Sequence, residues 1–260
     1  MRLKLTIEYA GTRYSGWQIQ KNARTIQGEI ERAIAVATDV REFELYGSGR
    51  TDAGVHALAQ VAHLEIRSTL APETMRRRIN DELPADIHVL RAEKVRHSFH
   101  ARHDAIGRTY IYQVSRRRTA FAKAYVWWVK DDLDLARMRS VAARFVGFHD
   151  FRAFTDSDSR EGSTEVLLEG LDVREDGDLI VFQVDGSHFI WKLVRRLVGV
   201  LVEVGRGGLT PDDAVALLTE TSDLPARLTA PASGLFLARV RYKGDSDEGP
   251  VKPAMMVWRA

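Results

Sequence analysis

Segments with the period of a β-strand and segments with the period of an α-helix follow one another along this chain. Near its start, Leu3, Leu5 and Ile7 alternate with polar residues, which is the two-residue period of a half-buried strand. Thr25 then precedes a run of apolar residues at helical spacing, and threonine is a common helix cap. The sequence therefore predicts a strand followed by a helix.

The same alternation continues to the end of the sequence. Further strands are expected at residues 60–66, 87–95, 108–114, 126–129, 164–174, 179–185 and 235–242. Further helices are expected at residues 72–83, 134–145 and 189–204, and from Thr210 onward. Because several strands follow one another without a helix between them, we predict an α+β fold. It would consist of two similar α/β halves, each a mostly antiparallel mixed sheet flanked by helices, with the active-site cleft between them.

With 260 residues, the chain exceeds the usual single-domain size of roughly 100 to 200 residues. We place a boundary near residues 104–107, which gives an N-terminal α+β domain (1–104) and a C-terminal α+β domain (105–260). A run rich in Ser, Asp and Gly at residues 155–163 predicts a flexible loop.

The absence of cysteine excludes disulfides, thiolate metal sites and cysteine nucleophiles. The first residues lack the apolar core of a signal peptide, and charged residues interrupt the longest apolar stretch, at residues 189–204. We therefore expect a cytoplasmic protein with no membrane contact.

The net charge of +2 conceals an uneven distribution. Lys and Arg outnumber Asp and Glu in residues 76–118, whereas acidic residues dominate residues 150–178. The basic region also carries Phe99, Tyr110 and Tyr112, and this combination suits RNA because cations neutralise phosphates while aromatic rings stack on bases. A solvated charged face explains the charge pattern equally well.

A glycine-rich segment at residues 47–54 contains the most informative candidate, Asp52. Glycines allow tight turns, so the Asp52 side chain would be presented on a loop beside the strand that follows. No Gly-Lys-Ser/Thr pattern follows, which argues against a phosphate-binding loop. From the residue types alone, an ordinary turn and a catalytic carboxylate both remain open.

The segment GRTDAGVHA, at residues 49–57, closely resembles the signature of the tRNA pseudouridine synthase A family. Other motifs resemble the family's in the same order along nearly the whole chain. They are EYAGTRYSGWQIQ at residues 8–20, FHAR at 99–102, Arg-x-Tyr-x-Tyr at 108–112, LVRRLVG at 193–199 and APASGLFL at 230–237.

This resemblance implies an isomerase that converts uridine to pseudouridine in the anticodon stem-loop of tRNA, at positions 38 to 40, after flipping the base. The reaction has no net redox change, so no cofactor is expected. The resemblance also implies a homodimer. Whether the carboxylate attacks the ribose, attacks carbon 6 of the base or drives a glycal route stays open.

The family's site residues map onto five positions of this sequence. The resemblance makes Asp52 the nucleophile, Arg195 its ionic partner, and Tyr110 the residue that meets the base and takes part in proton removal. Arg50 would help to extract the uridine, and Leu235 would pack beside the base.

Four of these assignments have plainer alternatives. Tyr112 faces the same side of its strand as Tyr110 and competes for its role. Arg196 competes with Arg195, and one of the two is expected to be a solvated helix cation. Leu235 also suits an ordinary core position, and Arg50 an ordinary phosphate contact.

Two departures from the family pattern concern local geometry. Ala10 stands where the family usually has Asp, which bears on turn stability, and Trp191-Lys192 puts the geometry around Arg195 in doubt. Histidines at positions 56, 63, 100 and 103 do not have the spacing of a metal site, so we expect no metal.

Two other functions remain open from the sequence. A non-catalytic tRNA-binding protein or RNA chaperone would bind RNA in a salt-sensitive way and form no isomer. A metal-dependent phosphohydrolase would need further carboxylates near Asp52, and the sequence has no second acidic cluster there.

Overall fold

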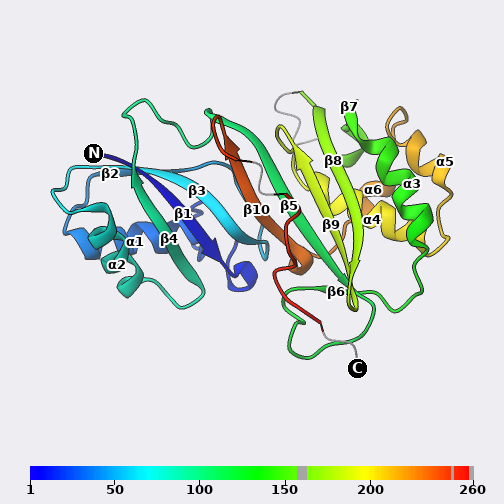
Figure 1. Ribbon diagram of the computed structural model, residues 1–260, viewed down its shortest axis with the longest axis horizontal. Coiled ribbons are helices and arrows are strands. Elements are labelled where there is room, and N and C mark those ends of the chain that lie inside the picture. The colour runs from blue at the N-terminus through cyan, green and yellow to red at the C-terminus, as the bar shows by residue number, and fades with distance from the viewer. Residues whose placement is uncertain (157–162, 247–248, 258–260) are drawn as a thin grey trace. The chain divides into compact units, whose positions relative to one another are not determined.

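The computed structural model describes residues 1–156, 163–246 and 249–257 (Figure 1). The chain divides into two compact units: the first comprises Met1–Ile106 and Leu237–Asp245, and the second comprises Gly107–Phe236 and Ser246–Ala260. Most of the loop expected at residues 155–163 lies outside the described residues.

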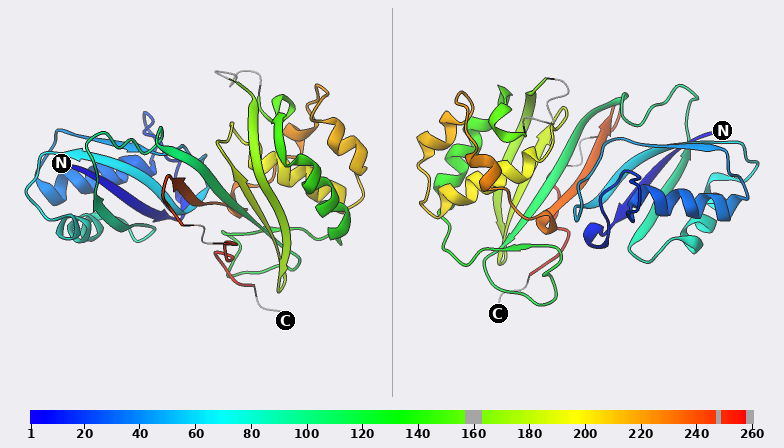
Figure 2. Two further views of the ribbon diagram at one scale, coloured as in Figure 1. Left: turned by 45° about the horizontal axis from the view of Figure 1, so that its top comes forward. Right: turned by 180° about the vertical axis from the view of Figure 1, so that it is seen from behind.

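The first unit is built on an antiparallel sheet. Its strands are β1 (Arg2–Tyr9), β2 (Phe43–Gly47), β3 (His56–Ile66), β4 (Ile87–Lys94) and the end of β10 (Leu235–Tyr242). The sheet order is β4-β1-β3-β10, and β2 also pairs with β3. The apolar residues that alternate along β1 are fully buried, because helices α1 (Ile26–Thr38) and α2 (Pro72–Glu82) cover one face of the sheet (Figures 1 and 2).

The second unit is also built on a run of mostly antiparallel strands. Its strands run in the order β5 (Ala105–Ser115), β9 (Leu179–Gly186), β8 (Glu165–Asp176) and β7 (Gly147–Asp150), with the short parallel strand β6 (Trp127–Trp128) beside β5. Helices α3 (Leu135–Phe145) and α4 (Leu193–Gly205) lie on one face of it (Figures 1 and 2). The shorter helices are α5 (Pro211–Ala216), α6 (Leu224–Arg227) and the 3-10 segments η1 (Gly11–Arg13), η2 (Arg152–Phe154) and η4 (Ala232–Gly234).

These mostly antiparallel strands with their flanking helices confirm the predicted α+β class. Thr25 caps α1, its hydroxyl accepting the Gly28 N–H at 3.2 Å, and Thr210 caps α5. The sequence did not predict β2, β7 or α6. The helix expected from residue 189 begins only at Leu193, because Lys192 adopts a left-handed conformation (φ 60°) that an α-helix cannot include.

The units differ from the expected division at residue 104 in one respect. Leu237–Asp245 belongs to the first unit, because β10 adds to the edge of β3. Tyr242, at the end of this strand, donates its hydroxyl proton to the Ala101 carbonyl at 2.6 Å and contacts the Phe99 ring. No helix within the described residues has the length and apolar character needed to cross a bilayer.

Candidate active site

Buried contacts with the end of β1 and the turn after it hold the loop that carries Asp52. The Trp17 N–H donates to the Thr51 carbonyl at 3.0 Å. The hydroxyl oxygens of Tyr9 and Thr51 lie 2.7 Å apart, and both residues are buried. Because Thr51 directly precedes Asp52, these contacts fix the backbone at the candidate nucleophile.

The turn after β1 approaches this loop so closely that two of its residues must be glycine. Gly16 has φ 95°, and a Cβ atom there would lie 2.6 Å from the Thr51 carbonyl oxygen. At Gly11 a Cβ atom would lie 1.9 Å from the Val55 carbonyl oxygen, and the Gly11 N–H donates to His56 Nδ1 at 3.0 Å. Both ends of the Asp52 turn are therefore packed against backbone.

Strand β3 supports the same loop from its N-terminal side. The Ser48 N–H donates to the Val61 carbonyl at 2.7 Å, and the Ser48 hydroxyl donates to Gln60 Oε1 at 2.7 Å. Gln60, which is fully buried, also donates its Nε2–H to the Gly49 carbonyl at 3.0 Å. The buried amide satisfies backbone groups that the loop leaves unpaired.

These contacts leave Asp52 half-buried on a tight turn, with its carbonyl accepting the Val55 N–H at 3.1 Å. Arg50, in the same loop, is exposed. The loop ends where β3 begins, at His56. The prediction that Asp52 lies on a loop beside a strand is confirmed.

In the second unit, the structure separates the two competing tyrosines on β5. Tyr112 is fully buried and donates its hydroxyl proton to the Pro231 carbonyl at 2.8 Å, and burial raises the pKa of its phenol well above the usual value. Tyr110 is only half-buried, and its ring meets Phe189 edge-on at 5.0 Å. Tyr112 is therefore a structural residue, whereas Tyr110 remains accessible.

The neighbouring arginines on α4 differ in the same way. Only 2% of the Arg196 side chain is exposed, and its guanidinium forms an ion pair with Asp156. Arg195 is half-buried, and its Nε–H donates to the Ala230 carbonyl at 2.7 Å. The expectation that one of the pair is a solvated helix cation is wrong, because Arg196 is a buried ion-pair partner and Arg195 is tied to the chain before β10.

The segment before β10 connects the candidate residues of the second unit. Its carbonyls accept hydrogen bonds from Arg195 and Tyr112, and a Cβ atom at Gly234 would lie 2.6 Å from the Tyr112 ring. Leu235, the next residue, has 6% of its surface exposed. The chain therefore gathers Arg195 and Leu235 around the buried Tyr112.

The departures from the family pattern have visible local effects. Ala10 stands at the N-cap of η1, where no side-chain hydrogen bond caps the turn. Nearby, Tyr14 donates its hydroxyl proton to Asp86 at 2.5 Å, and burial together with this bond raises the pKa of Tyr14. Before α4, the Lys192 ammonium lies 3.7 Å from the centre of the Trp191 ring, a cation–π contact.

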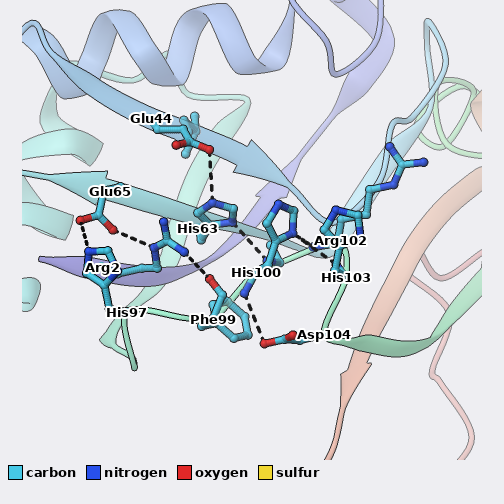
Figure 3. A network of polar contacts seen from close by, with 12 residues as sticks. Arg2, Glu44, His63, Glu65, His97, Phe99, His100, Arg102, His103 and Asp104 are labelled. Carbon is cyan, nitrogen blue, oxygen red and sulfur yellow. Dashed lines mark hydrogen bonds and ion pairs between the residues drawn. The ribbon is translucent and has the colours of Figure 1, made fainter.

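His63, His100 and His103, whose spacing in the sequence does not suit a metal site, form a supporting cluster in the first unit (Figure 3). His63 is buried and its Nδ1 accepts the Ala101 N–H at 3.1 Å, while His100 Nδ1 accepts the N–H groups of Arg102 and His103, each at 3.2 Å. These imidazoles must be neutral at Nδ1, since a protonated nitrogen cannot accept. Burial lowers the pKa of both His63 and His100, helped by Arg2 for His63 and by His103 for His100.

Comparisons with known proteins show where the chain belongs. A family model described as tRNA pseudouridine synthase matches residues 5–104 and 141–243. The chain belongs to this family. The matched ranges contain Asp52, Arg50, Arg195 and Leu235, whereas Tyr110 lies between them.

Curated relatives agree over nearly the full length. The chain is 43% identical to tRNA pseudouridine synthase A of Rhodopseudomonas palustris (strain BisA53), covering 93% of this chain and 99% of that protein. It is 39% identical to tRNA pseudouridine synthase A 2 of Clostridium tetani, covering 92% and 98% respectively. It is 40% identical to tRNA pseudouridine synthase A of Limosilactobacillus reuteri (strain DSM 20016), covering 95% and 98%.

A solved structure, of a Cbf5–Nop10–Gar1 complex, is 14% identical with a TM-score of 0.35 over 76% of this chain and 54% of that one, a likeness too weak to support an inference. Among residues 1–156, 163–246 and 249–257, no group of three or more His, Asp or Glu side chains is arranged to hold a metal ion.

Proposed function

We propose that this chain converts uridine to pseudouridine in the anticodon stem-loop of tRNA, at positions 38 to 40, with Asp52 as the nucleophile. Family membership carries the coarser statement that the chain is a tRNA pseudouridine synthase, an isomerase. The observation that best supports Asp52 is the loop around it, which two glycines and a buried Gln60 hold from both sides. A catalytic group benefits from such a fixed backbone, because it needs no reorganisation during the reaction.

The chemistry asks for a carboxylate and a proton acceptor. The bond between ribose C1′ and uracil N1 breaks, the base turns, and C1′ joins C5; the C5 proton leaves and N1 gains one. Asp52 would attack ribose C1′, as carboxylates do in retaining glycosidases, attack C6 of the base, or drive a glycal route. The balance involves no oxidant, reductant or energy source.

We assign the other roles by the same reasoning. Tyr110 stacks on the turned uracil and takes part in removing the C5 proton, because it remains accessible on its strand. Arg195 acts as the ionic partner of the Asp52 carboxylate, and Leu235 packs beside the base. Arg50, which is exposed, helps to extract the uridine from its stack.

The test is to incubate the protein with unmodified tRNA and map pseudouridine by carbodiimide treatment and primer extension. We expect stops in the anticodon arm for the wild type and none for Asp52→Asn, which removes the charge but little volume. Asp39→Asn is a matched control, because Asp39 is a left-handed C-cap residue of α1 where Asn is well tolerated.

Three outcomes would contradict the proposal. Binding of tRNA without any pseudouridine would indicate a non-catalytic RNA-binding protein. Loss of binding together with activity in Asp52→Asn would give Asp52 a role in folding or binding. Full activity in Asp52→Asn would exclude it as the nucleophile.

We also propose a homodimer in the cytoplasm that binds tRNA across both subunits. This follows from the resemblance of the chain to its family. Sedimentation equilibrium at the concentration used for activity should give twice the mass of the chain, and a monomer that is active at that concentration would refute the dimer.

A further inference from the structure

A small pocket of about 120 Å³ lies in the first unit beside the Asp52 loop. Its walls include Trp17, Gln18, Tyr46, Arg50 and Arg102. These side chains supply two guanidinium groups, two aromatic rings and an amide, and the described lining contains no carboxylate. Guanidinium groups favour phosphate, and aromatic rings favour the flat face of a base.

Tyr46, at the end of β2, is the ring best placed to stack. Its ring lies parallel to that of His63 at 5.8 Å between centroids (18° between planes) and meets His100 edge-on at 4.9 Å. Even so, 37% of the residue is exposed. A tyrosine supported by imidazoles while remaining exposed is a preformed stacking surface, because little side-chain entropy is left to lose.

Arg102 is presented to the pocket by the histidine cluster. His100 accepts the backbone N–H groups of Arg102 and His103, which fixes the turn, and the Arg102 side chain points away from the imidazoles (Figure 3). Arg102 is exposed, as is Arg50 on the other wall. Two guanidinium groups that approach one pocket from different segments match a single phosphate group better than any neutral ligand.

The position of the pocket ties it to the reaction. Arg50 lines the pocket and is separated from Asp52 only by Thr51, whose backbone is held by Trp17. When the target uridine lies at Asp52, a neighbouring nucleotide of the same RNA is therefore close to this pocket.

We propose that this pocket binds one unpaired nucleotide of the tRNA next to the target uridine, with its base on Tyr46 and its phosphate between Arg50 and Arg102. This subsite rests on the proposed function, because it would bind the nucleotide next to the uridine that is converted. It would hold the RNA in register while the target base is out of its stack.

The test is equilibrium binding of an unmodified tRNA transcript to the full-length protein over a series of salt concentrations. Asp52→Asn is used as the parent, so that the RNA is not converted. We compare Arg102→Gln, Tyr46→Leu and Tyr46→Phe with Arg77→Gln, a control on α2 whose side chain is 74% exposed and outside the pocket. Circular dichroism melting checks that each variant is folded.

Two distinct signatures are expected. Arg102→Gln should weaken binding about tenfold and lower the salt slope by about one, because one phosphate contact is lost. Tyr46→Leu should weaken binding about tenfold with the slope unchanged, because only a stacking contact is lost. Tyr46→Phe, which keeps the ring, and Arg77→Gln should both bind like the parent.

The proposal is overturned if Tyr46→Leu binds as tightly as Tyr46→Phe, since the pocket would then be a phosphate contact alone. It is also overturned if Arg102→Gln leaves the salt slope at the parent value. Product mapping with the wild type separates the two proposals: absence of pseudouridine together with both binding signatures would refute the proposed function and leave the nucleotide site standing.

Discussion

The two units position their candidate residues by different means. In the first unit, backbone groups from the end of β1 and from β3 fix the Asp52 loop, and Gly16 is needed for their close approach. In the second unit, each candidate has a neighbour of the same residue type, Tyr112 for Tyr110 and Arg196 for Arg195. The neighbour is buried, whereas the candidate is only half-buried. The contacts in the first unit fix the backbone of a loop. The contacts in the second unit determine which of two similar side chains stays accessible.

The largest test of this contrast concerns the tyrosines of β5. Tyr110→Phe should lower kcat by roughly 10² to 10⁴, the usual contribution of a proton-transferring group. Tyr112→Phe should retain most activity but lower the free energy of unfolding by about 0.5–1.5 kcal/mol, because the hydrogen bond from Tyr112 to the Pro231 carbonyl is lost. Single-turnover pseudouridine formation and urea denaturation measure the two quantities.

Either of two results would break the assignment. If Tyr112→Phe lost activity while keeping wild-type stability, the competing tyrosine would be the functional one. If both variants kept full activity, neither hydroxyl would serve in proton removal, and Tyr110 would be left as a stacking residue.

A smaller effect is expected at the glycine that holds the first unit's loop. Gly16→Ala combines an unfavourable φ with a contact of 2.6 Å to the Thr51 carbonyl oxygen, so we expect it to lower the free energy of unfolding by about 2–4 kcal/mol. Gly207→Ala is the matched control, since Gly207 has φ 81° but nothing within 4 Å of an added Cβ atom. It should cost only about 1 kcal/mol.

Both variants place alanine at a positive φ, so the difference between their free energies of unfolding measures the cost of the close contact with the Thr51 carbonyl oxygen. The shift of the Thr51 backbone in Gly16→Ala should also lower kcat, because a misplaced carboxylate loses its alignment. Equal stability and equal kcat in the two alanine variants would mean that the loop tolerates movement, and the contrast between the units would fail.

The smallest effect concerns the histidine cluster. His63 faces Arg2, His100 and Glu44, and His100 faces His103 and Asp104 as well as Arg2 and Glu44. Because the pKa of both imidazoles is lowered in the folded state, their contribution is complete above the unfolded value of about 6.5 and is lost as the pH falls below it. We expect the free energy of unfolding to decrease from pH 7 toward pH 5.

Urea denaturation of the wild type and of His100→Gln across this pH range measures the effect. The variant should show a weaker pH dependence, because one titrating group is gone. His88→Gln, which changes an exposed histidine, should keep the wild-type dependence. A His100→Gln curve parallel to that of the wild type would show that the pKa of His100 is the same in the folded and unfolded states.

The strand and helix periods predicted most of the elements, because each period follows from local backbone geometry. Strand β2 was missed, because it ends at Gly47, inside the glycine-rich segment that the sequence assigns to a loop. The sequence also could not separate Tyr110 from Tyr112, because both face the same side of β5 and the residues that contact Tyr112, such as Pro231, are distant in the chain.

The sequence named the candidate site residues, but it did not predict the hydrogen bonds that hold the loop around Asp52. Glycine spacing was sufficient to place Asp52 on a loop, and the resemblance supplied its partners. The hydrogen bond from Trp17 to Thr51 and the one from the Ala101 N–H to His63 Nδ1 join segments far apart in the chain, which no local pattern records.

The return of β10 to the first unit has a consequence for the order in which the protein is made. The first unit receives its last strand, Leu237–Tyr242, only after the whole second unit has been synthesised. Until then the edge of β3 lacks this partner, and Ala101, in the turn that presents Arg102, lacks the bond from Tyr242. On the ribosome, the half that carries Asp52 starts first and is completed last, so a nascent chain cut before residue 237 would hold the Asp52 loop on an unfinished sheet.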